Sequence, residues 1–215
     1  QERGVKVTVV DRKGVAAGSS WGNAGWLTPA LTLPLGEPAV PMSGPEAMLS
    51  SKSPLYIPLA LDPKLIRFLF GFAWHALPRQ WRKSIEIFAK VNPLAMEPFH
   101  ELAAGGVKEP VKEAQPFLAG FLSDKDRKGL LHEFDVVKSS GGTVDFDLAT
   151  GDELRSIEPT LSDAVACGVL LRGQYFINPP KYADSLAAAV VKRGAELKTG
   201  FSVEDIQDTD NGVTV

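Results

Sequence analysis

The pattern of apolar and polar positions at the start of the chain predicts a strand. Four valines stand at positions 5, 7, 9 and 10, with a lysine and a threonine between them. β-Branched residues at this spacing are typical of strands, and the valine pair at the end indicates burial there. The strand is expected to stop at the charged turn that runs from Asp11 to Gly14.

A helical pattern begins at Asp62-Pro63, where an N-cap residue precedes a proline at the first helical position. Its apolar stripe comprises Leu65, Ile66, Leu69, Phe70 and Ala73. The stripe fits a helix buried between two domains, or one that binds a membrane surface or a partner. We favour the buried helix because aromatic stripes are more often core, and the charge-interrupted run is too short to span a bilayer.

A second helical region, residues 81–104, is expected to break at Asn92-Pro93, because proline removes a backbone donor. The later half alternates strands and helices. Strands are predicted at residues 117–122, 143–146, 165–171, 175–177 and 195–199. Capping boxes at Ser123–Asp126 and Thr150–Glu153, and Asn178 before two prolines, mark helix starts. Residues 29–63 hold eight of the sixteen prolines and are expected to be extended and irregular.

The composition of the chain limits the kinds of partner and the cellular compartment that we expect. The 215 residues carry a formal charge of −3, so no basic surface is expected for nucleic acid. Cys167 is the single cysteine and the three histidines lack ligand spacing, so neither a disulfide framework nor a metal site is predicted. A reducing, cytoplasmic compartment fits these features, and peripheral contact with the inner face of a membrane stays open.

The candidate chemistry lies in residues 11–28. Asp11 closes the first strand, and an acid at that place can accept hydrogen bonds from the ribose hydroxyls of an adenine nucleotide. The following segment, from Gly18 to Gly25, is dense in glycine, serine and asparagine, which allow close backbone approach and supply donors. A strand followed by an ordinary surface loop is the alternative, and Asp11 alone would favour it.

The order of residues resembles one family. A strand, Asp11-Arg12, a spacer and the run SWGNAGWLTP at residues 20–29 resemble the FAD-dependent D-amino acid oxidase/dehydrogenase superfamily, above all bacterial D-amino acid dehydrogenases and glycine-oxidase-like enzymes. Residues 158–161 and 177–179 are similar to that family's return from substrate domain to cofactor domain. The resemblance implies FAD as cofactor, held by Asp11, Arg12, Ser19, Ser20, Asn23, Ala24, Gly25, Trp26, Leu27, Thr28 and Val203.

The resemblance also implies a fold of class α/β with α+β. Residues 1–61 and 178–215 would form part of a doubly wound, Rossmann-like FAD-binding domain, and residues 62–177 a mixed-sheet substrate or cap domain. The family's G-x-G-x-x-G motif occurs nowhere in the 215 residues. We therefore expect an internal fragment that lacks this motif and the C-terminal half.

The implied activity is oxidation of a D-amino acid or related amine to the imino acid, with hydride transfer to flavin N5. No catalytic side chain is assigned, because this transfer is the cofactor's own chemistry. Tyr175 and Arg172, on an expected strand pair, are the candidates for substrate contact. The electron acceptor stays open between oxygen, a quinone and a protein. Alternatives are an FAD-dependent 2-hydroxy acid dehydrogenase and a non-catalytic module without flavin, and the 215-residue chain itself is expected to be inactive.

Overall fold

The computed structural model describes residues 4–35, 62–209 and 212–214, which fall into two compact units. The first unit contains Gln1–Thr28, Ala95–Pro116 and Arg172–Val215; the second contains Pro29–Leu94 and Phe117–Leu171. These units follow the packing of the chain and divide it elsewhere than the two predicted functional domains. The assignment of residues 1–61 with 178–215, and of 62–177, stays a prediction.

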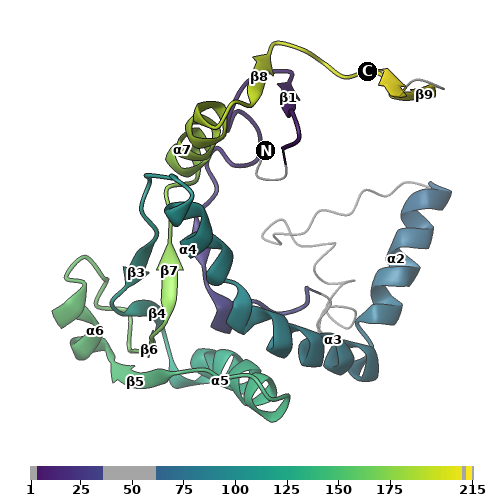
Figure 1. Ribbon diagram of the computed structural model, residues 1–215. Coiled ribbons are helices and arrows are strands. Elements are labelled where there is room, and N and C mark those ends of the chain that lie inside the picture. Colours follow the sequence, from purple (N-terminus) through teal and green to yellow (C-terminus); the bar gives the residue numbers. More distant parts are fainter. Residues whose placement is uncertain (1–3, 36–61, 210–211, 215) are drawn as a thin grey trace. The chain divides into compact units, whose positions relative to one another are not determined.

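In the first unit, strand β1 (Thr8–Asp11) lies parallel to β8 (Glu196–Thr199), as Figure 1 shows. The register pairs Thr8 with Glu196 and Asp11 with Thr199. Helix α7 (Pro179–Lys192) precedes β8, so a strand from the start of the chain and the strand that follows α7 form a parallel pair, the unit from which doubly wound sheets are built. Burial at the end of β1 was expected and is wrong: all four of its residues are exposed, because only β8 pairs with it among the described strands.

The first unit also contains a three-stranded antiparallel sheet. Strand β7 (Gln174–Phe176) lies between β2 (Trp26–Leu27) and β3 (Lys112–Ala114). Helix α4 (Glu97–Ala104) and α7 contribute to a small apolar core in which the rings of Phe99 and Tyr182 lie 5.6 Å apart. Residues 201–206 have no regular structure, and the hairpin of β9 (Gln207–Thr209) and β10 (Gly212–Thr214) follows.

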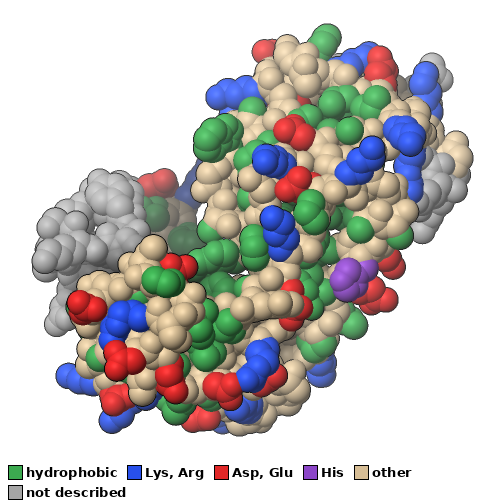
Figure 2. Space-filling model, turned by 90° about the vertical axis from the view of Figure 1, so that its left-hand side faces the viewer, with side chains coloured by type: hydrophobic (Ala, Val, Ile, Leu, Met, Phe, Trp, Pro, Cys, Tyr) green, Lys and Arg blue, Asp and Glu red, His purple; other side chains and the backbone are tan. Residues whose placement is uncertain are grey.

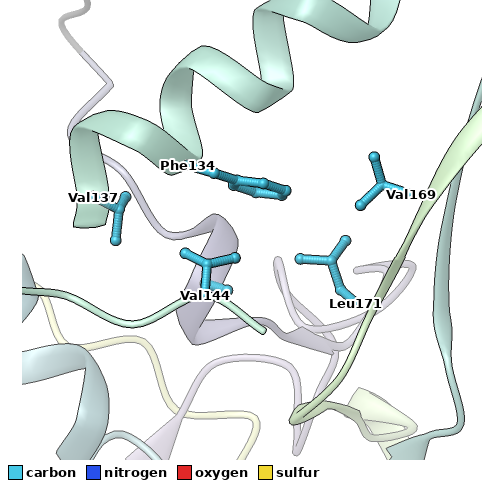
Figure 3. Packing of buried hydrophobic residues seen from close by; sticks show 6 residues of the cluster. Phe134, Val137, Val144, Val169 and Leu171 are labelled. Atoms are coloured by element: carbon cyan, nitrogen blue, oxygen red, sulfur yellow. The ribbon is translucent and has the colours of Figure 1, made fainter. Parts of the chain in front are cut away.

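The second unit is built on a three-stranded antiparallel sheet. Strand β6 (Cys167–Leu171) lies between β4 (Phe117–Phe121) and β5 (Phe146–Thr150). Helix α5 (Asp124–Ser139) covers this sheet, and Figure 3 shows Phe134 of α5 directed toward Val169 and Leu171 of β6. All three side chains are fully buried, so this contact is the centre of the core.

Local capping chemistry fixes the helix starts as predicted. Ser123 accepts from the backbone N–H of Asp126 at the start of α5, and Asn178 accepts from that of Lys181 in α7. Thr150 opens α6 (Gly151–Ile157) with a complete capping box. The three predicted helix starts are therefore confirmed. The sequence could predict them because a cap depends on residues only two or three positions apart.

The expected pairing of strands 165–171 and 175–177 is wrong. Strand β6 pairs with β4 and β5, whereas β7 pairs with β2 and β3. Gly173, at φ +67°, lies in the turn between them, where the chain passes from the second unit to the first. A short turn is typical of a hairpin, and partners distant in sequence override that local signal here.

Two helices of the second unit differ in burial. Helix α2 (Pro63–His75) begins at the Asp62 cap as predicted, but none of its residues is buried, so the favoured buried helix is wrong for the described residues. Helix α3 (Pro78–Val91) buries Ile85, and Asn92, in the 3₁₀ turn η2 (Asn92–Leu94), donates to the Pro29 carbonyl over 2.9 Å. The predicted break at Asn92-Pro93 is confirmed. The proline-rich stretch 29–63 lies mostly outside the described residues.

The distribution of surface charge, the length of the helices and the grouping of possible metal ligands are relevant to the partners that this chain could bind. Figure 2 shows one face of the molecule, on which acidic and basic side chains are interspersed with apolar ones rather than gathered by sign. No helix within residues 4–35, 62–209 and 212–214 is long and apolar enough to cross a bilayer. Across the same ranges no cluster of histidine, cysteine, aspartate and glutamate could hold a metal ion.

Removing the Thr150 hydroxyl tests how much the capping box contributes. Thr150→Ala is expected to lower the free energy of unfolding by about 1 kcal/mol, whereas Thr150→Ser keeps the oxygen and stays close to wild type. The backbone N–H and the hydroxyl of Thr150 both donate to Glu153 and lower the pKa of that carboxyl. Its stabilising effect is present above the unfolded pKa and is lost as pH falls through the folded pKa, so the Thr150→Ala deficit should narrow in acid. Urea titrations at several pH values measure the free energy of unfolding and its dependence on pH. Equal losses of this free energy in Thr150→Ala and Thr150→Ser would contradict the role of the Thr150 hydroxyl as a cap.

Candidate functional site

Asp11 stands at the carboxyl end of β1, which is where nucleotides bind in parallel sheets. Its Oδ1 accepts the backbone N–H groups of Gly14 over 2.6 Å and Lys13 over 2.8 Å. These two bonds lower the pKa of the carboxyl, with a smaller contribution from the charge of Arg12. Within the described residues no hydrogen bond occupies Oδ2, so the turn fixes the exposed carboxylate and leaves one oxygen for a ligand.

The segment after β8 returns to this carboxylate. The backbone N–H of Phe201 donates to the carbonyl oxygen of Asp11 over 3.2 Å. Val203, predicted to contact adenine, follows two residues later and is 47% exposed, outside regular structure. The structure therefore brings Phe201 to the end of β1, and the predicted contact of Val203 with adenine stays a prediction.

The loop after β1 contacts the end of β7 and the start of α7 at Gly25. Gly25 has φ +75°, and its carbonyl accepts the backbone N–H of Ile177 over 2.9 Å. A Cβ on Gly25 would lie 2.1 Å from the Ile177 carbonyl oxygen and 3.0 Å from Cδ of Pro179. Glycine is thus required twice, for its backbone conformation and for the close approach of two chain segments.

This junction borders an open surface hollow of about 290 Å³ within the first unit, lined by Ser19, Ser20, Asn23, Gly25, Trp26, Leu27, Ile177 and Pro179. Two hydroxyls and one amide supply the polar part of its lining, and the rest is apolar. Asn23 Oδ1 accepts the backbone N–H of Gly25 over 2.8 Å, which orients the amide and leaves its NH₂ group as a donor. A ligand with a polar edge and a flat apolar body suits this lining.

The predicted cofactor residues separate into two groups. Six of them line the hollow, namely Ser19, Ser20, Asn23, Gly25, Trp26 and Leu27, while Asp11 and Arg12 lie at the strand end. Ala24 precedes β2 and Thr28 follows it, and neither of them lines the hollow. Ile177 and Pro179 line it and were not predicted as site residues. The helix start at residues 177–179 was recognised in the sequence, but only the pairing of β2 with β7 brings it to the loop.

The two candidate substrate residues are placed differently. Tyr175, half-buried, lies directly opposite Leu27 in the β2–β7 pair, beside the hollow's lining. Arg172 is exposed in the turn before β7, and its carbonyl accepts the side-chain amide of Gln174 over 2.8 Å. Tyr175 therefore lies closer to the predicted cofactor loop in the fold than its distance in sequence suggests.

Comparison with known proteins defines the class. The sequence profile of the FAD-dependent oxidoreductase family DAO matches residues 1–215, and the chain belongs to this family. The chain resembles D-amino acid dehydrogenases from Helicobacter pylori and Cereibacter sphaeroides. The first is 23% identical over 208 residues, 97% of this chain and 49% of that protein. The second is 26% identical over 215 residues, 98% of this chain and 49% of that protein.

Solved structures agree on the fold. Glycine oxidase from Bacillus cereus matches with a TM-score of 0.58 at 16% identity, over 99% of this chain and 47% of that chain. FAD-bound L-α-glycerophosphate oxidase from Mycoplasma pneumoniae matches with a TM-score of 0.60 at 15% identity, over 96% of this chain and 41% of that chain. The chain thus spans about half the length of the relatives it matches.

The donor set of the first unit fits FAD, which members of this family bind. An exposed carboxylate at the end of a parallel strand suits a ribose, and the hollow behind Gly25 combines hydroxyl and amide donors with an apolar wall. The hollow is large enough for a part of this cofactor. We therefore carry FAD into the functional proposal.

Two glycines of the loop allow a matched test of the junction. Gly25→Ala should disrupt it, because the new Cβ would meet backbone; Gly22→Ala shares the positive φ, +74°, but its Cβ would meet no atom within 4 Å. Both variants carry a conformational cost of about 1–2 kcal/mol, and Gly25→Ala should lose clearly more. Hydrogen exchange of the Ile177 amide should accelerate only in Gly25→Ala. Equal exchange and equal stability in the two variants would show that the close approach is unimportant.

Proposed function

We propose that the protein is an FAD-dependent oxidoreductase that oxidises a D-amino acid or a related amine to the imino acid. The observation that carries the proposal is the exposed, turn-fixed carboxylate of Asp11 in the same unit as the Gly25 hollow. Membership of the FAD-dependent oxidoreductase family and similarity to D-amino acid dehydrogenases support the cofactor and the substrate class. When bound, FAD supplies the hydride acceptor, flavin N5.

In this proposal the chain's own residues bind and orient. Asp11 accepts hydrogen bonds from ribose hydroxyls through Oδ2, while Oδ1 stays with the backbone of its turn. Ser19, Ser20 and the Asn23 amide donate to polar parts of the cofactor, and Trp26 and Leu27 supply an apolar wall. Further cofactor contacts come from the remaining predicted residues, Arg12, Ala24, Gly25, Thr28 and Val203.

Substrate contact is proposed for Tyr175 and Arg172. A phenol hydroxyl donates a hydrogen bond and a guanidinium binds a carboxylate through two parallel bonds, so the two groups suit an amino acid carboxylate. Tyr175 has the better support because it is paired with Leu27 in the sheet beside the hollow. No acid or base among the side chains is required, since orientation of the substrate α-hydrogen toward the cofactor is the protein's task.

We also propose a cytoplasmic location, supported by a single cysteine that is buried and has no partner for a disulfide. Oxygen, a quinone or a protein would take the electrons from the reduced cofactor. A module that holds no flavin is the alternative that the binding experiment separates from this proposal.

The test of the cofactor site replaces the Asp11 carboxylate by an amide in the whole protein. Asp11→Asn keeps an oxygen that can accept the N–H groups of Lys13 and Gly14, so the turn is preserved. It removes the charge and the second acceptor, so the dissociation constant for FAD should rise about tenfold or more. Quenching of flavin fluorescence during titration measures this constant.

Asp135→Asn is the matched control, because Asp135 is an exposed acid on α5 in the other unit. Its FAD affinity should equal that of wild type. An unchanged dissociation constant in Asp11→Asn would remove Asp11 from the cofactor site. Absence of any flavin binding by the wild-type protein would favour the non-catalytic module.

A further inference from the structure

The side chain of Gln174 is buried at the start of β7. Its exposed fraction is 3%, and among the residues that the structure describes it is the one side-chain amide in the core. This burial is independent of any further chain that packs on the first unit, because added contacts can only increase it. A buried amide is costly unless it is hydrogen-bonded, so its bonding partner indicates what the residue does.

A partner of this amide is a backbone carbonyl two residues earlier. Nε2 of Gln174 donates to the carbonyl oxygen of Arg172 over 2.8 Å. The bond closes a small ring across Gly173, whose φ of +67° turns the chain at this point. Because a peptide group is planar, a bond to its carbonyl restrains the backbone on both sides of it. The amide of Gln174 therefore restrains the residue that carries the Arg172 side chain.

The sheets themselves do not include this turn. Strand β6 ends at Leu171 and β7 begins at Gln174, and the two strands belong to different sheets. Arg172 and Gly173 therefore lie outside the strand ladders. The Gln174 side chain supplies a hydrogen bond at a place where the backbone bonds of both sheets stop.

Tyr175 is held in a different way. It lies opposite Leu27 of β2 on one side of β7 and opposite Glu113 of β3 on the other. A strand with partners on both sides holds its residues in register. The two side chains proposed for substrate contact are thus fixed separately, Tyr175 by the sheet and Arg172 by the turn, and Gln174 connects the turn to the sheet.

We propose that Gln174 is a positioning residue for substrate binding, whose buried amide holds the turn so that Arg172 and Tyr175 bind one substrate carboxylate together. A guanidinium and a phenol can share a carboxylate only at a fixed separation, and supporting hydrogen bonds set such separations. The inference rests on the proposed function and deepens it, because it names the group that orients the substrate-binding cation. Gln174 itself contacts neither substrate nor cofactor in this proposal.

Reduction of bound FAD by substrate, followed in the whole protein without oxygen, tests the proposal. D-Alanine, D-proline and N-methylglycine are assayed, and the fastest of them gives a half-saturating concentration and a limiting rate. Gln174→Met removes the donor but keeps the length and volume of the side chain, which suits a buried position. The half-saturating concentration should rise roughly tenfold, and the limiting rate and the dissociation constant for FAD should stay near wild type.

Ser185→Ala is the matched control for a lost hydrogen bond in the first unit. Ser185 Oγ, on α7, accepts the backbone N–H groups of Lys108 over 2.7 Å and Glu109 over 3.1 Å. Removing this oxygen should affect stability and leave the half-saturating concentration unchanged. Thermal unfolding of each variant separates lost stability from lost substrate binding.

Gly173→Ala perturbs the same turn while Gln174 stays intact. A Cβ on Gly173 would meet no atom within 4 Å, so the change strains only the backbone. It should raise the half-saturating concentration as Gln174→Met does. Gly194→Ala is its control, because Gly194 has φ +91°, has the same open space and lies just after α7 in the first unit.

A double-mutant cycle shows whether Gln174 acts through Arg172. In the Arg172→Ala background the turn no longer carries the cation, so Gln174→Met should change the half-saturating concentration by less than about twofold. Independent effects of the two substitutions would overturn the positioning role, because Gln174 would then act by another route.

The remaining outcomes separate this inference from the proposed function. A wild-type protein whose FAD none of the three substrates reduces would overturn the proposed function and this inference with it. An active wild type with unchanged saturation in Gln174→Met, or with equal losses in Gln174→Met and Ser185→Ala, would overturn the positioning role alone. If Gln174→Met does not fold, the comparison of Gly173→Ala with Gly194→Ala decides, and equal saturation in these two variants would overturn the proposal.

Discussion

The candidate site depends on one backbone junction, the close approach of Gly25 to Ile177. The junction pairs β2 with β7 and holds a loop from the start of the chain against the start of α7, more than a hundred residues later. Closing so long a connection is unfavourable in entropy, and the contacts formed at the junction must offset that cost. A glycine at positive φ allows those contacts, and the hollow lined by Ser19 and Asn23 exists because of it.

The parallel pair β1–β8 supplies the second part of the site by the same logic. It brings the strand that ends in Asp11 beside a strand that follows α7, so the junction at the helix start and the pair beyond its end both lie in the first unit. The bond from Phe201 to the Asp11 carbonyl continues this arrangement past β8. The Asp11 carboxylate, the loop at Gly25 and the segment at Phe201 thus depend on two pairings between distant parts of the chain, and weakening either one would separate groups that the functional proposal assigns to one ligand.

What the sequence could predict was local. The caps Ser123, Thr150 and Asn178 and the break at Asn92-Pro93 were found because each is decided by a few neighbouring residues. Strand partners were harder: the parallel pairing of β1 with β8 follows from alternating strands and helices, whereas β6 and β7 resembled a hairpin and belong to different sheets. Ile177 and Pro179 were missed as site residues because no spacing in the sequence places them against a loop near residue 25.

Helix α2 shows where apolar periodicity stops being informative. A stripe such as Ile66, Phe70 and Trp74 is equally compatible with a protein core and with the boundary of a bilayer, because both remove apolar area from water. Burial separates the two, and α2 has no buried residue in the described chain. The next helix, α3, carries Arg79, Arg82 and Lys83 on an exposed face, and charged side chains of this kind are rarely buried in a core. Periodicity of side chains and sign of charge must therefore be considered together before an apolar helix is assigned to a core.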